Sequence, residues 1–302
     1  MVRETLEVEL CGLRLRTPLV PAAGTLSREE LPEVAGAFGA VLPKTVTLEP
    51  RPGNPPPRIA EAPSGMINSI GLENPGLDAF LSELDLYDVG LPVFVSVAGE
   101  TPGEFARVCR RLAGDERVAA VELNLSCPNT ERGEETFCSH PPSVEEVVSA
   151  CREAMPQKPL FAKLASERVL ENSLAAGRAG ADAVTLINTI PALAVDARTR
   201  RVFLAGGLSG PAIKPVALRC VHQVSRTVEV PVIGCGGVVS GTDVAEFMLA
   251  GATAVQVGSG SFVRDVREIL EGFLSYLEEN GLRARDLTAG SVPLRRPVGP
   301  PP

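Results

Sequence analysis

Short apolar runs rich in β-branched residues recur along the chain, and each precedes a stretch of helical periodicity. The runs are apolar on both faces, which is typical of strands buried in a parallel sheet. We therefore predict eight strands, at Leu19–Ala22, Ala40–Thr47, Val93–Ala98, Val118–Leu125, Leu160–Leu164, Ala183–Asn188, Val230–Gly234 and Ala254–Gly258.

Helix-start signals stand between these strands. Thr101 and Glu104 form a capping box around Pro102, and Ser143 with Glu146 repeats the pattern. The predicted helices are Ser27–Phe38, Leu77–Leu86, Thr101–Leu112, Ser143–Met155, Ser166–Ala179, Pro211–Arg226, Gly241–Ala250 and Val266–Asn280. Alternating strands and helices over about 250 residues predict a (β/α)8 TIM barrel. The alternative is a doubly wound open sheet, but no stretch matches the G-x-G-x-x-G turn that usually accompanies it.

The segments outside this alternation complete the architecture. Residues Thr5–Pro18 alternate apolar and polar positions, which predicts an N-terminal β-hairpin. Long loops follow three predicted strands at their carboxyl ends, where barrel enzymes build their sites: Leu48–Gly76, Cys127–Pro142 and Thr189–Gly210. No linker interrupts the chain, so we predict one domain over residues 1–302, ending in a loose Pro-rich tail at 295–302.

Composition narrows the class of partner. The chain has 302 residues, and 29 Lys and Arg against 37 Asp and Glu give a net charge of −8. This balance argues against a broad surface for nucleic acid or an anionic membrane. The first ten residues carry three acids, and no apolar run approaches the roughly 18 residues of a membrane span. We expect a soluble, cytoplasmic protein.

The cysteines are scattered rather than clustered. There are seven, without a CxxC pair, and only two histidines accompany them. We therefore expect no zinc site and no iron–sulfur cluster within this chain. Most of the cysteines are interpreted as small buried apolar residues, and Cys127 is the exception.

Polar residues end several of the predicted strands. In a parallel barrel these ends face one another, which would bring together Lys44-Thr45, Ser96, Asn124, Cys127, Lys163 and Asn188-Thr189. Lys44 and Lys163 lie within apolar runs, and an unpaired buried charge is costly. We therefore expect the two lysines to face an anionic ligand.

Glycine clusters follow the last two strands, at Gly234–Gly237 and Gly258–Gly260. In barrels the loops at these places commonly bind phosphate through backbone N–H groups. Ordinary tight turns are the alternative for either cluster alone. The presence of both favours a cofactor that carries a phosphate, and Gly206–Gly210 adds a further glycine-rich segment.

Cys127 is the candidate catalytic residue. Nearby positive charge lowers a thiol pKa from about 8.5, which makes the thiolate usable as a general base near neutral pH. The loop that begins at Cys127 is long enough to close as a lid. The alternative is a small residue packed beneath a turn.

Several segments resemble the class 1 dihydroorotate dehydrogenases, from Thr5 to about Leu287. The most specific are Ser64–Gly76 (SGMINSIGLENPG) and Leu123–Asn129 (LNLSCPN). The others are Pro43–Thr47, Ile187–Thr189, Gly206–Pro215, Gly234–Val238 and Val257–Ser259. The resemblance implies an FMN-binding (β/α)8 barrel that oxidises dihydroorotate to orotate in pyrimidine (UMP) biosynthesis.

The resemblance also implies roles for individual residues. Cys127 would remove the C5 proton while hydride passes from C6 to flavin N5, and Lys163 would lie near the flavin N1/O2 edge. The implied FMN-binding residues are Ala23, Lys44, Thr45, Ser96, Asn124, Lys163, Ile187, Gly210, Gly236, Gly237, Gly258 and Ser259. The implied substrate-binding residues are Lys44, Asn68, Ser69, Ile70, Gly71, Leu72, Asn124, Asn188 and Thr189, whose amides suit the donors and acceptors of orotate.

Within class 1, the Ser64–Gly76 segment is most similar to the NAD-linked subtype (class 1B). In that subtype an FAD/[2Fe–2S] subunit carries electrons from FMN to NAD. This chain has no clustered cysteines for such a cluster, so we expect the [2Fe–2S] cluster on a partner subunit. We also expect the catalytic chains to form a homodimeric core. Ala23 and Ser96 depart from the serine and asparagine that are usual in the subtype.

Three other functions remain open at this point. The nearest is the fumarate-linked class 1 enzyme, which works without the partner. A related flavin barrel could act on another pyrimidine, as dihydropyrimidine dehydrogenases do. From a different class, a phosphate-binding lyase or isomerase could use Lys44 or Lys163 as a Schiff base.

Overall fold

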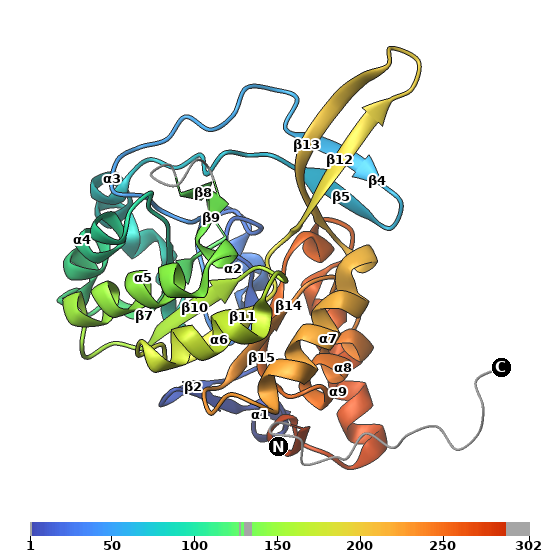
Figure 1. Cartoon of the computed structure of the whole chain (residues 1–302). Helices are drawn as coiled ribbons and strands as arrows, with labels where there is room; N and C mark the ends of the chain where they lie inside the picture. The colour runs from blue at the N-terminus through green and yellow to red at the C-terminus, as the bar shows by residue number, and fades with distance from the viewer. Residues whose placement is uncertain (1, 127, 130–134, 288–302) are drawn as a thin grey trace.

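A curled parallel sheet forms the centre of the molecule. The computed structural model describes residues 2–126, 128–129 and 135–287 (Figure 1). Among these residues, seven strands pair in parallel in the order β3-β15-β14-β11-β10-β7-β6. Their bounds are β3 Leu19–Pro21, β6 Val93–Val97, β7 Val118–Asn124, β10 Leu160–Leu164, β11 Ala183–Leu186, β14 Val232–Cys235 and β15 Ala252–Val257. The prediction of a (β/α)8 barrel is confirmed.

The predicted strand Ala40–Thr47 is irregular, yet it occupies the remaining place in the barrel. It makes only isolated parallel bridges to β6, from Val41 to Val93 and from Val46 to Val97. On its other side the backbone N–H of Gly39 donates to Leu19 O of β3, at 2.8 Å. Pro43 lies between the two bridges and has no N–H to donate, which explains why the ladder is interrupted.

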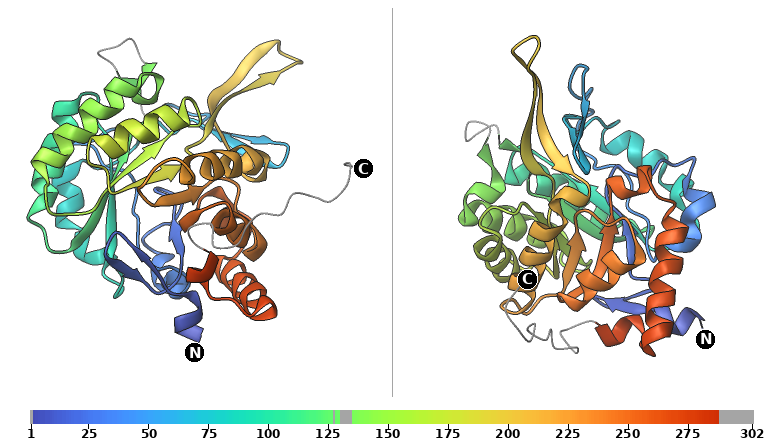
Figure 2. Two further views of the ribbon diagram at one scale, coloured as in Figure 1. Left: turned by 60° about the horizontal axis from the view of Figure 1, so that its bottom comes forward. Right: turned by 90° about the vertical axis from the view of Figure 1, so that its right-hand side faces the viewer.

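Helices cover the outside of this sheet (Figure 2). Their bounds are α2 Leu31–Val34, α3 Leu77–Ser82, α4 Pro102–Ala113, α5 Pro141–Ala154, α6 Val169–Arg178, α7 Lys214–Ser225, α8 Gly241–Leu249 and α9 Val266–Asn280. The Thr101 hydroxyl accepts from Glu104 N at 3.2 Å, as the capping box predicts. The prediction that Ser143 caps the next helix is wrong, because α5 begins at Pro141 and Ser143 is buried inside it. The first predicted helix is also shorter, with α2 continued by a 3-10 turn at Ala35–Ala37.

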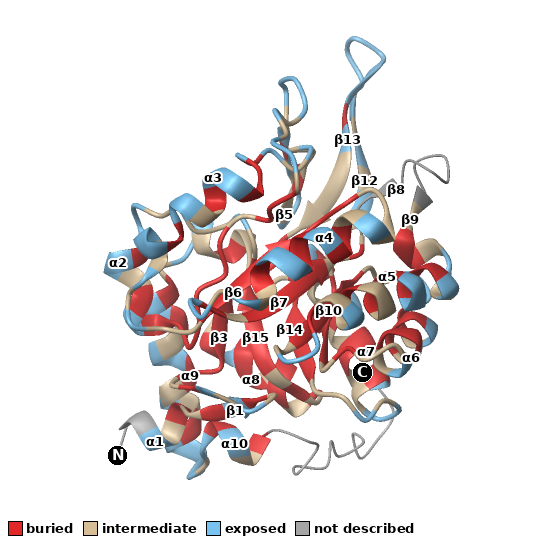
Figure 3. Ribbon diagram, turned by 90° about the vertical axis from the view of Figure 1, so that its left-hand side faces the viewer, coloured by how far each residue is buried: buried red, intermediate tan, exposed pale blue. Residues whose placement is uncertain are grey.

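The strands are buried on both faces, as their composition predicts (Figure 3). One continuous core joins the barrel interior to the inner sides of the helices. Phe94 of β6 packs edge-on against Phe161 of β10, with ring centroids 5.4 Å apart. No helix in the described part of the chain combines the length and apolarity needed to cross a bilayer.

A second sheet lies beside the carboxyl ends of the barrel strands, and we call it the upper sheet. It is antiparallel, in the order β12-β13-β5-β4, with bounds β4 Ile59–Ala62, β5 Gly65–Asn68, β12 Ile190–Asp196 and β13 Arg201–Ser209. Ala60, Ile67 and Leu204 form a small core of its own. Two of the segments predicted as long loops, Leu48–Gly76 and Thr189–Gly210, therefore contain strands that pair with each other.

The predicted N-terminal hairpin is confirmed. Strands β1 (Val8–Leu10) and β2 (Leu13–Leu15) pair antiparallel, and a short helix α1 (Val2–Leu6) precedes them. Helix α10 (Ala284–Leu287) packs against α1. After β7, strand β8 (Pro128–Asn129) pairs with β9 (Glu135–Thr136).

Candidate active site

A cavity of about 620 Å³ opens at the carboxyl ends of the barrel strands, below the upper sheet. This volume lies within the range of small-molecule and cofactor sites. The cavity is lined by most of the predicted site residues: Ala23, Lys44, Thr45, Asn68, Ser69, Ile70, Gly71, Leu72, Asn124, Lys163, Ile187, Asn188, Thr189, Gly210, Gly237, Gly258 and Ser259. Strand ends and long loops thus converge as the barrel geometry requires.

Two predicted residues that the structure describes, Ser96 and Gly236, do not line the cavity. Cys127 lies outside the described residues. Ser96 is buried, and its hydroxyl lies 2.9 Å from the hydroxyl of Thr45, a residue that does line the cavity. Gly236 lies behind the wall, where a Cβ would approach the Ala217 Cβ to 2.9 Å.

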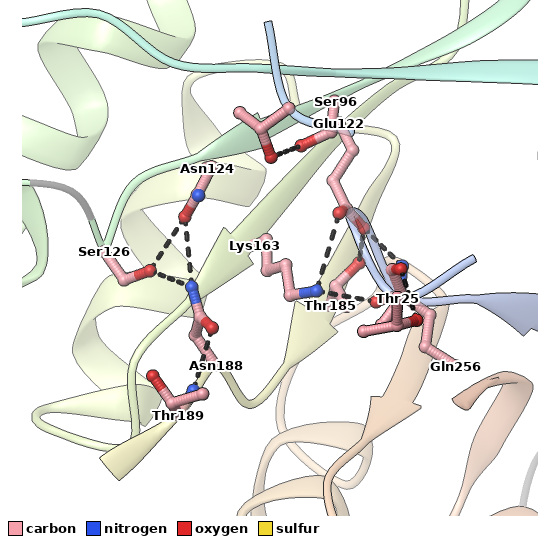
Figure 4. A network of polar contacts seen from close by, with 12 residues as sticks. Thr25, Ser96, Glu122, Asn124, Ser126, Lys163, Thr185, Asn188, Thr189 and Gln256 are labelled. Atoms are coloured by element: carbon pink, nitrogen blue, oxygen red, sulfur yellow. Dashed lines mark hydrogen bonds and ion pairs between the residues drawn. The ribbon is translucent and has the colours of Figure 1, made fainter. Parts of the chain in front are cut away.

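Lys163 lies at the floor of the cavity and belongs to a buried polar network (Figure 4). Its Nζ donates to Gln256 Oε1 at 2.8 Å and lies 3.7 Å from Glu122 Oε1. Burial lowers the pKa of Lys163, but Cys235 and Glu122 more than offset this, so the pKa lies above its ordinary value. Lys163 therefore has a protein counter-ion, Glu122, that the sequence reasoning missed.

Lys44 differs from Lys163, because it makes no hydrogen bond or ion pair to the residues that the structure describes. Burial lowers the pKa of Lys44, and the charge of Glu73 offsets this only in part. Its aliphatic chain lies against Gly24, where a Cβ would come within 2.7 Å of Lys44 Cδ. Lys44 is the half-buried cation that an anionic ligand in this cavity would pair with.

Asn124, Ser126 and Asn188 form a hydrogen-bonded triangle beside Lys163 (Figure 4). Asn124 Oδ1 accepts from Ser126 Oγ at 2.8 Å and from Asn188 Nδ2 at 3.1 Å. Asn188 Nδ2 also donates to Ser126 Oγ, and Asn188 Oδ1 accepts from Thr189 N at 2.8 Å. These bonds leave Asn124 Nδ2 as the amide group that can donate to a ligand.

The loop after β5 also lines the cavity. Asn68 Nδ2 donates to Gly207 O of β13 at 3.4 Å, which ties the loop to the upper sheet. Asn54 supports it from outside by donating to Ser69 O at 3.1 Å. Gly71 and Leu72 both have positive φ, at 75° and 55°, so the backbone turns sharply there. The predicted substrate-binding loop is thus held at both of its faces.

The late glycines meet on the side of the cavity formed by β14 and β15. Gly237 has φ of 80°, and a Cβ there would lie 2.8 Å from Gly210 O, so glycine is required for the two loops to approach. A Cβ on Gly258 would meet only the Ala22 Cβ, at 3.5 Å, which leaves this backbone open to the cavity. Ser259 Oγ donates to Ser209 Oγ at 2.9 Å beside them.

Other residues of the wall escaped the sequence reasoning: Ala22, Gly24, Thr25, Ile59, Met66, Ser126, Ser209, Ile213, Cys235 and Phe262. Ile59, Met66 and Ser209 belong to the upper sheet, whose pairing was not predicted. Cys235 is buried beside Lys163, and burial raises its pKa. Within the described ranges, no three His, Cys, Asp or Glu side chains are arranged to hold a metal ion.

Comparison with known proteins places this site in a family. The family profile described as dihydroorotate dehydrogenase matches residues 5–275. The chain is 47% identical over 299 residues to the dihydroorotate dehydrogenase B (NAD(+)) catalytic subunit of Pelobacter propionicus, covering 95% of this chain and 98% of that protein. It is 46% identical over 293 residues to the protein of the same name from Trichlorobacter lovleyi, covering 93% and 96%.

The fold is also similar to that of a solved structure. DHODH from Eimeria tenella, crystallised in complex with ferulenol, matches 96% of this chain and 89% of its own, with a TM-score of 0.81 and 23% sequence identity. At this identity the likeness shows the fold alone. The family profile and the sequence identities establish the family. The chain belongs to the dihydroorotate dehydrogenase family of oxidoreductases.

Proposed function

We propose that this protein is the catalytic subunit of an NAD-linked dihydroorotate dehydrogenase, which oxidises dihydroorotate to orotate in pyrimidine biosynthesis. The observation that carries the proposal is the cavity, because residues from Lys44 to Ser259 that the resemblance assigns to flavin and substrate line one space. The sequence identity of 47% to a catalytic subunit of that name supports the same reaction.

FMN is the proposed cofactor, and the residues present fit it. The open backbone at Gly258 and the turns at Gly210 and Gly237 suit a phosphate group, since glycines carry no side chain of their own to block its approach to the backbone N–H groups. Ala23, Thr45 and Ile187 line the same cavity. When bound, FMN supplies the acceptor for the hydride that leaves C6 of dihydroorotate.

Substrate is proposed to bind between the Asn124 triangle and the loop after β5. Asn124 Nδ2 donates to an acceptor of the pyrimidine ring, and Lys44 pairs with the carboxylate, because it has no protein partner among the described residues. Asn68 to Leu72, Asn188 and Thr189 complete the polar wall. The amides thereby fix the orientation of the ring.

Proton removal at C5 is assigned to Cys127. The residue follows Ser126, whose hydroxyl is fixed by Asn124 and Asn188 at the cavity wall. Lys44 and Lys163 line the same cavity, and positive charge nearby favours a thiolate. Lys163 is assigned to the electron-rich edge of the flavin ring.

Electrons are proposed to pass to NAD through an FAD/[2Fe–2S] partner subunit. The relatives are named as catalytic subunits of an NAD(+) enzyme, which supports a second subunit here. We also propose a homodimeric core. Its support is an apolar face on the β12–β13 ribbon, where Leu193, Val195, Val202 and Phe203 are at least 50% exposed. Exposed apolar patches of this kind commonly mark protein interfaces.

The purified protein tests the proposal directly. We expect a yellow protein whose flavin absorbance is bleached anaerobically by dihydroorotate and not by dihydrouracil. A colourless protein, or one bleached only by dihydrouracil, would contradict the proposed function. Co-purification from the native source should recover an FAD/iron–sulfur subunit, and electron transfer to NAD should require it.

A further inference from the structure

A buried carboxylate lies beneath the cavity floor, and the proposed reaction gives it no role. Glu122 is 1% exposed and comes from β7, two residues before Asn124. Its Oε2 accepts from Thr185 Oγ1 at 2.8 Å and from Gln256 Nε2 at 2.6 Å. Burying a charged carboxylate is costly, so its retention at this place calls for a function.

The bonds around Glu122 determine how Gln256 and Lys163 are oriented. Because Gln256 Nε2 donates to Glu122, the other end of the same amide, Oε1, faces Lys163 and accepts from Nζ at 2.8 Å. Glu122 Oε1 has no hydrogen-bond donor among the described residues and lies 3.7 Å from Nζ. One oxygen thus orients the amide while the other supplies the counter-charge (Figure 4).

The charged and titratable neighbours of Lys163 come from two strands. Glu122 lies on β7 and Cys235 on β14, while Gln256 of β15 and Thr185 of β11 are neutral. A lysine that is 6% exposed would lose its proton readily without a counter-ion, since burial alone can lower a lysine pKa by up to about 3–5 units. Burial raises the pKa of Cys235, which favours its neutral thiol, so Glu122 is the charged group that prevents this.

We propose that Glu122 is a positioning residue, which acts through Gln256 and its own charge to hold Lys163 protonated and aimed into the cavity. The inference rests on the proposed function, because Lys163 is there assigned to the electron-rich edge of FMN. A fixed ammonium favours the reduced flavin, whose ring carries more negative charge, over the oxidised form. Glu122 would therefore tune the reduction potential without touching the flavin.

The decisive variant is Glu122→Gln, which keeps the shape and an acceptor for Gln256 but removes the charge. We expect the preference for reduced over oxidised FMN to fall about tenfold, which lowers the two-electron potential by about 30 mV. Affinities of the apoprotein for both forms of FMN give the same ratio independently of turnover. Glu145→Gln, on the outer side of α5, is the matched control and should leave the potential unchanged.

A double variant separates positioning from a direct effect. Lys163→Met should lower the potential by itself, and adding Glu122→Gln should then change it no further. An unchanged or raised potential in Glu122→Gln, or a full additional shift in the Lys163→Met background, would overturn the inference. If Glu122→Gln fails to fold, Gln256→Met removes the link between the two groups and should lower the potential in the same direction.

These outcomes are distinct from failure of the proposed function. A wild-type protein that binds no FMN, or that dihydroorotate does not reduce, contradicts the proposed function itself. A wild-type protein that does both, with a Glu122→Gln variant of unchanged potential, contradicts only the role of Glu122.

Discussion

Asn188 donates its side-chain amide to the side-chain oxygen of Asn124, at 3.1 Å, and so determines which end of Asn124 is left for a ligand. Ser126 reinforces the arrangement by donating to the same oxygen. The two asparagines come from β7 and from the segment after β11, so the polarity of this wall depends on two units of the barrel that flank β10.

Ser126→Ala should weaken binding of orotate. The variant removes one of the two hydrogen bonds that orient Asn124, and a typical net hydrogen bond of about 1 kcal/mol corresponds to roughly a fivefold loss in affinity. Perturbation of the flavin spectrum by orotate would measure the dissociation constant. Ser275→Ala, on the outside of α9, should bind orotate like the wild type. Unaltered affinity in Ser126→Ala would argue against the orienting role.

Cys127→Ala should retain bound FMN but reduce it slowly. Loss of a general base commonly costs about 10²–10⁴ in rate, so we expect at least a ~10²-fold slower anaerobic reduction by dihydroorotate. Stopped-flow absorbance would follow the flavin. Cys220→Ala replaces a buried thiol on α7 and serves as the control, with the rate preserved. A normal rate in Cys127→Ala would remove this residue from the mechanism.

Lys163→Ala should destabilise the fold as well as the site. Removing one partner of a buried ion pair costs about 3–5 kcal/mol, because Glu122 is left charged and unpaired. The double variant Lys163→Ala/Glu122→Gln should recover part of this loss, since the orphaned charge is gone. Urea unfolding of the apoproteins measures both free energies. Equal stability of the single and double variants would show that the pair is not coupled.

Asp243 makes the stability depend on acidic pH. Burial raises its pKa, but the bonds from Lys214, Val239 N and Ser240 outweigh this, so the pKa lies below its ordinary value. A depressed folded-state pKa contributes stability above about pH 4, and this is lost as the pH falls through the folded value. Asp243→Asn should therefore be less stable than the wild type near pH 6.

The difference between Asp243→Asn and the wild type should shrink as the pH falls below about 4, where the carboxylate of the unfolded chain takes up its proton, and should be lost once the pH is below the folded-state pKa. Urea midpoints at both pH values test this. Glu279→Gln, at the exposed end of α9, should follow the wild type throughout. A difference that stays constant into acid would contradict the charge-based explanation.

Val195→Glu should dissociate the proposed homodimer. Val195 is 60% exposed on the outer face of β12, and a carboxylate there would be buried without a partner in an interface. Sedimentation should show monomers for this variant and dimers for the wild type. Val216→Glu, at a 41% exposed position on α7, provides the control and should remain dimeric. A dimeric Val195→Glu would place the interface elsewhere.

The barrel was predictable because its strands are apolar on both faces and its helices carry start signals. The pattern missed only local departures, such as the interruption at Pro43 and the earlier start of α5 at Pro141. The part of the site that is built from the ends of barrel strands was predictable from the sequence. Lys44, Asn124 and Lys163 belong to this part, and they line one cavity as expected.

The remaining features depend on contacts between distant segments. Glu122 and Gln256 form a hydrogen bond across the barrel although they are 134 positions apart in the sequence. In the sequence alone, each is a single polar residue within an apolar strand. The upper sheet was missed for the same reason, because most of the barrel strands lie between β5 and β13 in the sequence. The alternating exposure of β12 has no counterpart in an alternation of apolar and polar residues, because every position from Ile190 to Val195 is apolar.

The upper sheet has a consequence for how the protein is assembled. It joins Asn68 to Gly207, which are 139 positions apart, and its own core contains three residues in the described chain. Pairing of such distant segments has to follow formation of the barrel units between them. In native-state hydrogen exchange, the amides of β4 and β5 should therefore open before those of β7 and β10. FMN and substrate would then have a route into the cavity that leaves the barrel intact.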